Sequence, residues 1–120
     1  MARDPRKLRV FEHADALVLE VYRATAVFPA EERFGLQTQL RRAAVSAATN
    51  IVEGSARRTT REYLNFLNIA NGSSAEACYL LDIAQRLGLL EQAVQAPLVD
   101  RYTELMKGLQ RLITVLEREP

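Results

Sequence analysis

The chain has 120 residues, 48% of them hydrophobic and 26% charged, which is the composition of one folded domain and excludes a disordered or fibrous protein. Its net charge of +1 is far from the strong basic excess of a typical nucleic-acid-binding domain, but residues 1–61 carry 11 basic and only 7 acidic side chains. A single cysteine excludes an intrachain disulfide. With no secretory signal and no apolar run long enough to span a bilayer, we expect one cytoplasmic domain over residues 1–120.

Four segments have the hydrophobic spacing of amphipathic helices, with apolar residues at steps of three and four. We expect helices over about 8–27, 33–56, 60–87 and 97–118. In the first of them, the inward face comprises Phe11, Ala14, Val18, Val21, Tyr22 and Thr25, with Leu17 beside it. No segment shows strand-like alternation. Four long helices joined by short connections predict an all-α fold, an antiparallel up-down-up-down four-helix bundle.

Local signals mark where these helices begin and end. Phe28-Pro29 ends the first helix, because the residue before a proline is disfavoured in the helical region. Thr59 and Glu62 have the spacing of a capping box at the start of the third helix, and Gly88 suits its C-terminal cap. Proline is best tolerated in a first helical turn, so Pro97 is placed at the start of the fourth helix.

The third helix contains a run of small residues, NGSSAEA, over residues 71–77. Glycine inside a helix costs about 1 kcal/mol relative to alanine. We therefore expect Gly72 to allow another helix to approach closely, in preference to a strained ligand loop.

The helix over 33–56 has two distinct faces. Its inward stripe comprises Leu36, Leu40, Ala43, Ala44, Ala47 and Ile51. A second stripe is polar throughout and comprises Gln39, Arg42, Ser46, Asn50, Glu53 and Arg57. Between the two, on the remaining side, lies a strip with Arg41, Val45, Ala48 and Val52. A polar stripe beside a second small apolar strip suggests that the outer side of this helix also has a partner.

Enzymatic signatures are absent: there is no phosphate-binding glycine loop, nucleophile elbow or dinucleotide fingerprint. His13 is the only histidine, so a di-iron site with paired Glu-x-x-His motifs is excluded, and we expect no metal and no cofactor. A lone Cys78 more often behaves as a small hydrophobe than as a nucleophile. Glu53 and Glu76 lie among small or polar residues and could act as an acid–base pair. Hydrogen bonds with Arg42, Asn50 or Arg57 are the favoured interpretation.

Two interpretations of the arginines stay open. Arg41, Arg42, Arg57, Arg58 and Arg61 could contact phosphates. They could equally form a solvated or subunit-pairing face. The polar residues that we expect at a subunit interface or in a structural polar network are Gln39, Ser46, Asn50, Glu53 and Glu76.

Two stretches carry a resemblance to a known family: ERFGLQTQLRRAAVSAATNIVEGSARR, and EYLNFLNIANGSSAEACYLLDIAQRLGLL after it. Together with the opening LRVFEHADALVLEVYRATAVFP, they resemble the four-helix-bundle proteins encoded in intervening sequences of bacterial 23S ribosomal RNA genes. The resemblance covers roughly residues 8–90, and the fourth helix matches only in pattern. Two positions depart from the family: Ser55 stands where a bulky aromatic is usual, and Asn71 where a basic residue is common.

The resemblance implies a bundle that assembles into a homo-oligomeric ring, a homopentamer, with no established enzymatic activity. The accessory proteins of diversity-generating retroelements form a related pentameric branch that binds nucleic acid and the reverse transcriptase. On that analogy, the arginines named above are the candidates for binding RNA or DNA. The leading hypothesis is thus a non-enzymatic oligomer that binds nucleic acid through clustered arginines. The alternative is a protein-interaction scaffold whose arginine stripe serves subunit contacts.

Overall fold

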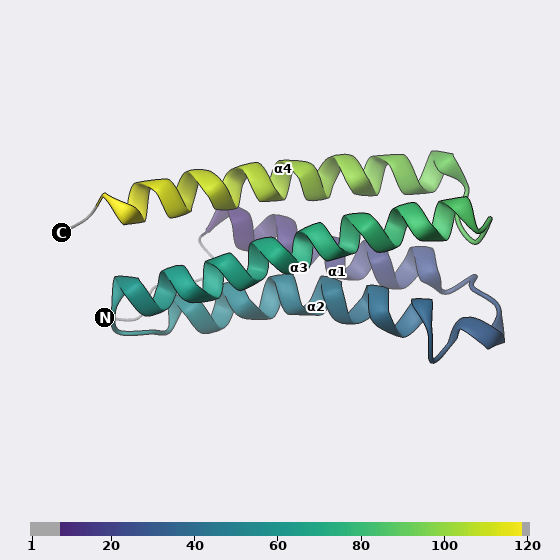
Figure 1. Cartoon of the computed structure of the whole chain (residues 1–120), viewed down its shortest axis with the longest axis horizontal. Helices are drawn as coiled ribbons and strands as arrows, with labels where there is room; N and C mark the ends of the chain where they lie inside the picture. Colours follow the sequence, from purple (N-terminus) through teal and green to yellow (C-terminus); the bar gives the residue numbers. More distant parts are fainter. Residues whose placement is uncertain (1–7, 119–120) are drawn as a thin grey trace.

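The computed structural model describes residues 8–118, which form four long helices and no strand (Figure 1). The long helices are α1 (Arg9–Thr25), α2 (Leu36–Ser55), α3 (Thr60–Arg86) and α4 (Gln92–Glu117). A short 3-10 helix, η2 (Ala30–Glu32), lies between α1 and α2. The all-helical prediction is confirmed for these residues. The expected domain also includes residues 1–7 and 119–120, which lie outside the described part.

The start of α2 shows how the chain turns after α1. Beyond Phe28-Pro29 the chain forms η2, and α2 begins at Leu36 rather than near residue 33. Gly35 departs from helical geometry, with φ −110° and ψ −113°, and separates the two elements. The Glu32 carboxylate accepts a hydrogen bond from the Leu36 amide at 3.2 Å, so it satisfies one of the free N–H groups in the first turn of α2.

Both predicted caps of α3 are present. The Glu62 amide donates to the Thr59 hydroxyl at 3.1 Å, and that hydroxyl donates to the Glu62 carboxylate at 2.9 Å. At the other end Gly88 has φ +76°, the left-handed conformation that favours glycine. The Leu89 amide donates to the Ala84 carbonyl at 2.8 Å, and the Gly88 amide to the Gln85 carbonyl at 3.0 Å. This is the double hydrogen bond of a Schellman motif.

The predicted start of α4 is wrong by about one turn. The helix begins at Gln92, and Pro97 lies inside it rather than at its first position. Proline has no N–H, so the carbonyl of Ala93 has no partner four residues ahead. Ala93 and Pro97 are both exposed, which leaves this carbonyl on the solvent side of the helix, and residues 92–96 are good helix formers that extend the helix past the proline.

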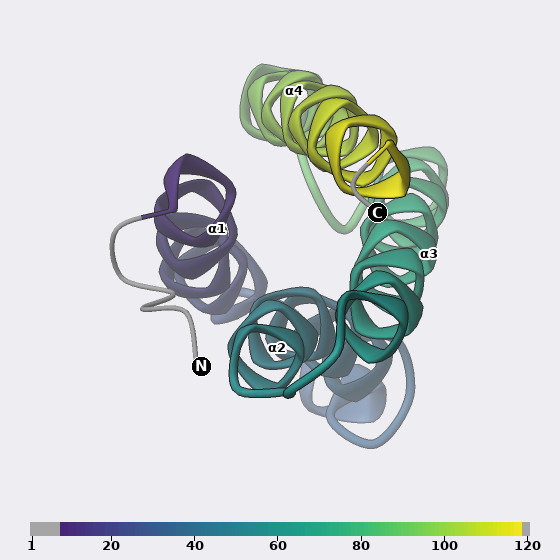
Figure 2. The same ribbon diagram turned by 90° about the vertical axis from the view of Figure 1, so that its left-hand side faces the viewer.

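The four helices surround one common core (Figure 2). The backbone of each helix lies close to those of its two neighbours, most extensively between α2 and α3, and not to that of the diagonal helix. The shape is elongated, 49 × 22 × 19 Å. Figure 1 places the α2–α3 connection at one end, together with the start of α1 and the end of α4. The other two connections lie at the opposite end.

The inward stripe predicted for α2 is buried at every position. The buried residues of α3 and α4 also recur mainly at steps of three and four, as expected for amphipathic helices. One prediction in α1 is wrong: Tyr22 is 42% exposed. The buried face of α1 is centred on Ala14, Leu17, Val21 and Thr25. Tyr22 follows Val21 in the chain and lies at the edge of this buried face.

The close approach between helices occurs at a different glycine from the predicted one. Gly72 is exposed, and a Cβ added there would meet nothing within 4 Å, because the buried side of its run comprises Ser73, Ser74 and Ala77. Gly54 of α2 is the tight position. A Cβ there would lie 2.8 Å from the Phe66 Cβ and 2.9 Å from the Tyr63 Cδ1, so no larger residue fits without movement of α3.

Candidate nucleic-acid interface

The five candidate arginines form two groups rather than one cluster. Arg41 and Arg42 lie in the second turn of α2, whereas Arg57, Arg58 and Arg61 surround its connection to α3. Arg57 lies 16 positions after Arg41, a separation of roughly 24 Å along a helix at 1.5 Å per residue. A single copy of the chain therefore presents two separate basic groups.

Arg41 is held by the end of α1. Its Nε donates to the Thr25 hydroxyl at 2.9 Å and its Nη2 to the Tyr22 carbonyl at 3.2 Å. Its guanidinium carbon also lies 4.4 Å from the centroid of the Tyr22 ring. The Thr25 hydroxyl in turn donates to the Val21 carbonyl at 2.8 Å. Arg41 therefore links α2 to α1 through two hydrogen bonds and its contact with the Tyr22 ring.

The remaining four arginines are exposed. Arg57 stacks on Phe66, with its guanidinium carbon 4.7 Å from the ring centroid. Arg42, Arg58 and Arg61 make no ion pair or hydrogen bond with any other residue of 8–118. The ion pairs found in this part of the chain are Arg23–Glu20, Arg101–Glu20, Arg86–Asp82 and Lys107–Glu104. Within residues 8–118, the α2–α3 connection thus presents arginines that have no ion-pair partner.

Part of the predicted polar stripe joins α2 to α3. The hydroxyls of Ser46 and Ser73 lie 2.8 Å apart, and the Asn50 Nδ2 donates to the Ser46 carbonyl at 2.8 Å and to its hydroxyl at 3.1 Å. Ser73 was not among the predicted residues. The feature of the sequence that could have predicted its role is its position in the small-residue run of α3. A short hydroxyl side chain there can reach a neighbouring helix.

The other residues predicted for a subunit interface or a structural polar network do not join these hydrogen bonds. Gln39, Glu53 and Glu76 are all exposed, and none makes a hydrogen bond or ion pair within residues 8–118. The contacts that we expected from the two glutamates to Arg42, Asn50 or Arg57 are therefore absent from the described part of a single chain. Their side chains are left facing outward.

A shallow groove runs over the outer side of α2. Its volume is about 690 Å³. It is lined by Tyr22, Thr38, Arg41, Arg42, Val45, Ser46, Thr49, Asn50 and Glu53. Val45 on its wall and Val52 beyond it are 38% and 39% exposed. The second face predicted for α2 is thus open on a single chain.

Two titratable groups in the interior are suited to packing rather than chemistry. Burial raises the pKa of the half-buried Cys78 thiol, which disfavours the nucleophilic thiolate. Burial, and then the nearby Cys78, raise the pKa of the Tyr102 hydroxyl as well. Across residues 8–118, no three His, Cys, Asp or Glu side chains gather closely enough to hold a metal ion. Among the four helices, none combines the length and apolar character that crossing a membrane requires.

Comparison with known proteins identifies relatives by sequence and by fold. A family model described as 23S rRNA-intervening sequence protein matches residues 6–111. Among curated proteins, none matches the chain. A solved structure from Bacteroides thetaiotaomicron VPI-5482, a protein with unknown function from the S23 ribosomal protein family, superposes with a TM-score of 0.78. It is 21% identical, and the match covers 87% of this chain and 97% of that one. At this identity the likeness shows the fold alone.

Proposed function

This chain belongs to the 23S rRNA-intervening sequence protein family, and from that premise we propose that it is a non-enzymatic protein that binds RNA or DNA as a homo-oligomer. Its binding residues are Arg42, Arg57, Arg58 and Arg61. Arg41 holds α2 against α1 and so supports the helix turn that carries Arg42. In this proposal the subunit is an up-down-up-down bundle in a cytoplasmic ring, a homopentamer like the accessory proteins of diversity-generating retroelements.

One observation carries the proposal: three exposed guanidinium groups, of Arg42, Arg58 and Arg61, have no acidic partner within residues 8–118. An arginine left without a carboxylate keeps its full charge and its donors for phosphate, which it binds in a bidentate manner. Arg57 adds a fourth cation. Because its guanidinium group stacks on Phe66, the side chain is already partly ordered and loses less conformational entropy on binding.

Assembly would compensate for the weak net charge of a single chain. Each basic group is small, but a ring repeats it once per subunit, and affinity for nucleic acid rises with the number of phosphates neutralised. We assign to subunit contact the part of the α2 groove that Val45, Ser46 and Asn50 line, and leave Arg42, which also lines the groove, to nucleic acid.

The alternative is a protein-interaction scaffold without nucleic-acid binding. It is favoured by Glu53 and Glu76, which are exposed and lack a partner within residues 8–118. In an assembly these carboxylates would pair with the arginines of an adjacent copy. The same arginines would then be consumed by subunit contacts.

The test is fluorescence anisotropy of the protein with a labelled structured RNA and a duplex DNA, titrated from low to physiological salt. Counterion release predicts that the logarithm of affinity falls linearly with the logarithm of salt concentration. Replacing Arg58 and Arg61 by glutamine should weaken binding and lower the salt slope by about one for each phosphate that the variant no longer neutralises.

The matched control replaces Arg23 and Arg86 by glutamine. These arginines are also exposed and their replacement removes the same charge, but they lie at the opposite end of the molecule. Oligomeric state is measured in parallel by light scattering. Equal weakening by the two pairs, or no binding at low salt, contradicts a localised nucleic-acid site. Dissociation of the Arg58/Arg61 variant into monomers supports the scaffold instead.

A further inference from the structure

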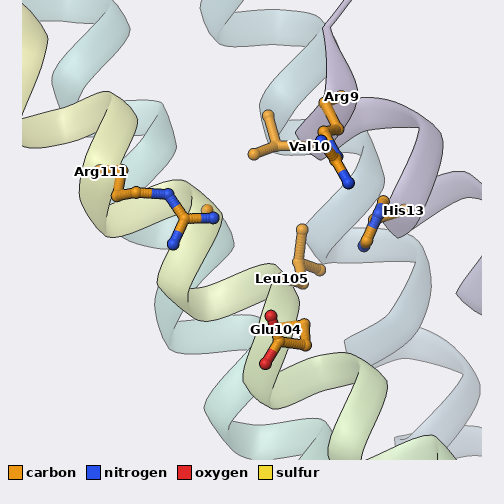
Figure 3. Close-up of a pocket in the computed structure, with 7 residues that line it drawn as sticks. Arg9, Val10, His13, Glu104, Leu105 and Arg111 are labelled. Carbon is orange, nitrogen blue, oxygen red and sulfur yellow. The ribbon is translucent and has the colours of Figure 1, made fainter.

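A second cationic site lies between α1 and α4, far in sequence from the arginines of α2. It is a cavity of about 270 Å³ near the start of α1 (Figure 3). Its lining comprises Arg9, Val10, His13, Glu104, Leu105, Gly108 and Arg111. Figure 3 shows Arg111 reaching from α4 toward the side of the cavity that Arg9 and His13 line.

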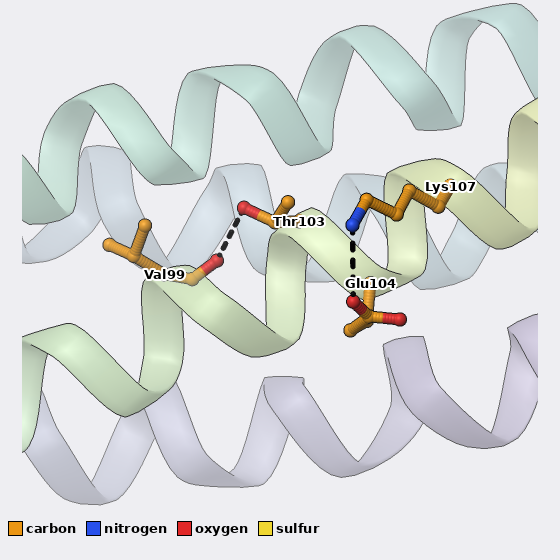
Figure 4. A network of polar contacts seen from close by, with 4 residues as sticks. All are labelled: Val99, Thr103, Glu104 and Lys107. Atoms are coloured by element: carbon orange, nitrogen blue, oxygen red, sulfur yellow. Dashed lines mark hydrogen bonds and ion pairs between the residues drawn. The ribbon is translucent and has the colours of Figure 1, made fainter.

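The charges around this cavity are predominantly positive. Arg9 and Arg111 make no ion pair with any residue of 8–118. Glu104 is the one acidic residue of the lining, and its carboxylate lies 3.4 Å from the Lys107 ammonium (Figure 4). The Glu104 carboxylate is thus paired with Lys107 and with neither guanidinium group of the lining.

The cavity wall is small and apolar beneath these cations. Gly108 provides the space: a Cβ there would lie 3.1 Å from the Val10 Cγ1 and 3.9 Å from the Arg111 Nη2. Leu105 is buried beside it. The positive end of α1 lies at the same place, because the helix begins at Arg9 and its N-cap, Leu8, provides no side-chain acceptor.

We propose that this cavity binds the phosphate group of a small phosphate monoester. Two guanidinium groups from different helices can hold a tetrahedral anion from two sides, and the His13 ring adds an N–H donor. The volume lies just below the range of about 300–1,000 Å³ that is typical of pockets for drug-sized ligands, so the cavity suits a phosphate with a short organic group. None of these residues belongs to the proposed nucleic-acid surface, so the inference does not depend on that function.

The experiment is an NMR titration of the isotopically labelled protein with inorganic phosphate and, separately, with ribose 5-phosphate. Sodium chloride at the same ionic strength and pH provides the reference. We expect saturable shifts in residues 9–13 and 104–111 with both probes. Tighter binding of ribose 5-phosphate would show that the cavity also contacts the organic group, and equal affinities would restrict the site to the phosphate. Shifts no larger than those with chloride would overturn the proposal.

The phosphate affinities of three variants distinguish a localised anion site from an effect of the protein's overall charge. Arg111→Gln should weaken binding about ten-fold, because a charge-assisted hydrogen bond is removed. Glu104→Gln should strengthen it roughly two- to five-fold, because the acidic residue of the lining is removed. Arg33→Gln removes the same charge as Arg111→Gln, but Arg33 is exposed after η2 at the opposite end of the molecule, so phosphate affinity should stay unchanged. Equal affinities in the Arg111 and Glu104 variants would contradict the site.

Discussion

The α2–α3 and α1–α4 seams lie on opposite sides of the core and are built differently (Figure 2). Between α2 and α3, Gly54 leaves no room for a Cβ, and the Ser46 and Ser73 hydroxyls meet at 2.8 Å. Helices α1 and α4 pack less closely, and long charged side chains border a cavity between them. The first seam is closed by small residues and hydrogen bonds, and the second is held open.

Side-chain size and charge explain this difference. Small residues allow helix axes to approach, and each buried hydroxyl needs a hydrogen-bond partner, which for Ser73 is Ser46 of the adjacent helix. Between α1 and α4, Val10 faces Gly108, and Arg101 lies 3.8 Å from Glu20, so larger and longer side chains separate these two helices. An added methyl group should therefore change the free energy of unfolding strongly in the closely packed α2–α3 seam and only weakly in the α1–α4 seam.

The largest effect is expected at Gly54. Gly54→Ala places a Cβ at 2.8 Å from the Phe66 Cβ, and we expect it to lower the free energy of unfolding by about 2 kcal/mol despite the better helix propensity of alanine. Urea unfolding followed by far-ultraviolet circular dichroism measures this change. Gly72→Ala is the matched control, because its Cβ meets nothing, and it should raise stability by up to about 1 kcal/mol. If both substitutions stabilise the protein, the α2–α3 seam is not closed as described.

A moderate effect is expected for the hydroxyl pair. Ser73→Ala removes the hydrogen bond to Ser46 and should cost about 1 kcal/mol of unfolding free energy. Asn50 still donates to the Ser46 hydroxyl, which limits the destabilisation. The same urea measurement on Ser46→Ala and on the double variant gives the coupling between the two side chains. Additive effects would show that the serines do not interact.

The smallest effect is expected at Gly108. Its added Cβ would lie 3.1 Å from a terminal methyl group of Val10, which needs to move only slightly. The gain in helix propensity should offset this movement, so Gly108→Ala should change stability by less than about 0.5 kcal/mol. In a Val10→Ala background the obstruction is gone, and the substitution should become stabilising. A destabilisation as large as that of Gly54→Ala would mean that both seams are equally tight.

The sequence alone determined that four helices form and which residues make up most of their inward faces, because both depend on local periodicity and caps. The spacing of Thr59 and Glu62, and the single glycine at position 88, specify the ends of α3 within a few residues. The same reasoning misplaced the start of α4, because the proline rule is a preference that the helix-forming residues before Pro97 outweigh. Gly72 was misassigned because a composition of small residues does not show which of them faces a neighbour.

The tertiary structure decided which charged side chains remain available. Arg41 and Arg42 are adjacent in the chain, but a helix turns by about 100° between them. One therefore meets the end of α1, where Thr25 and Tyr22 bind it, and the other faces solvent. Arg9 and Arg111 lie at one cavity only because α1 and α4 pack together. Local patterns report the face of a helix, whereas contacts between distant segments depend on how the helices pack.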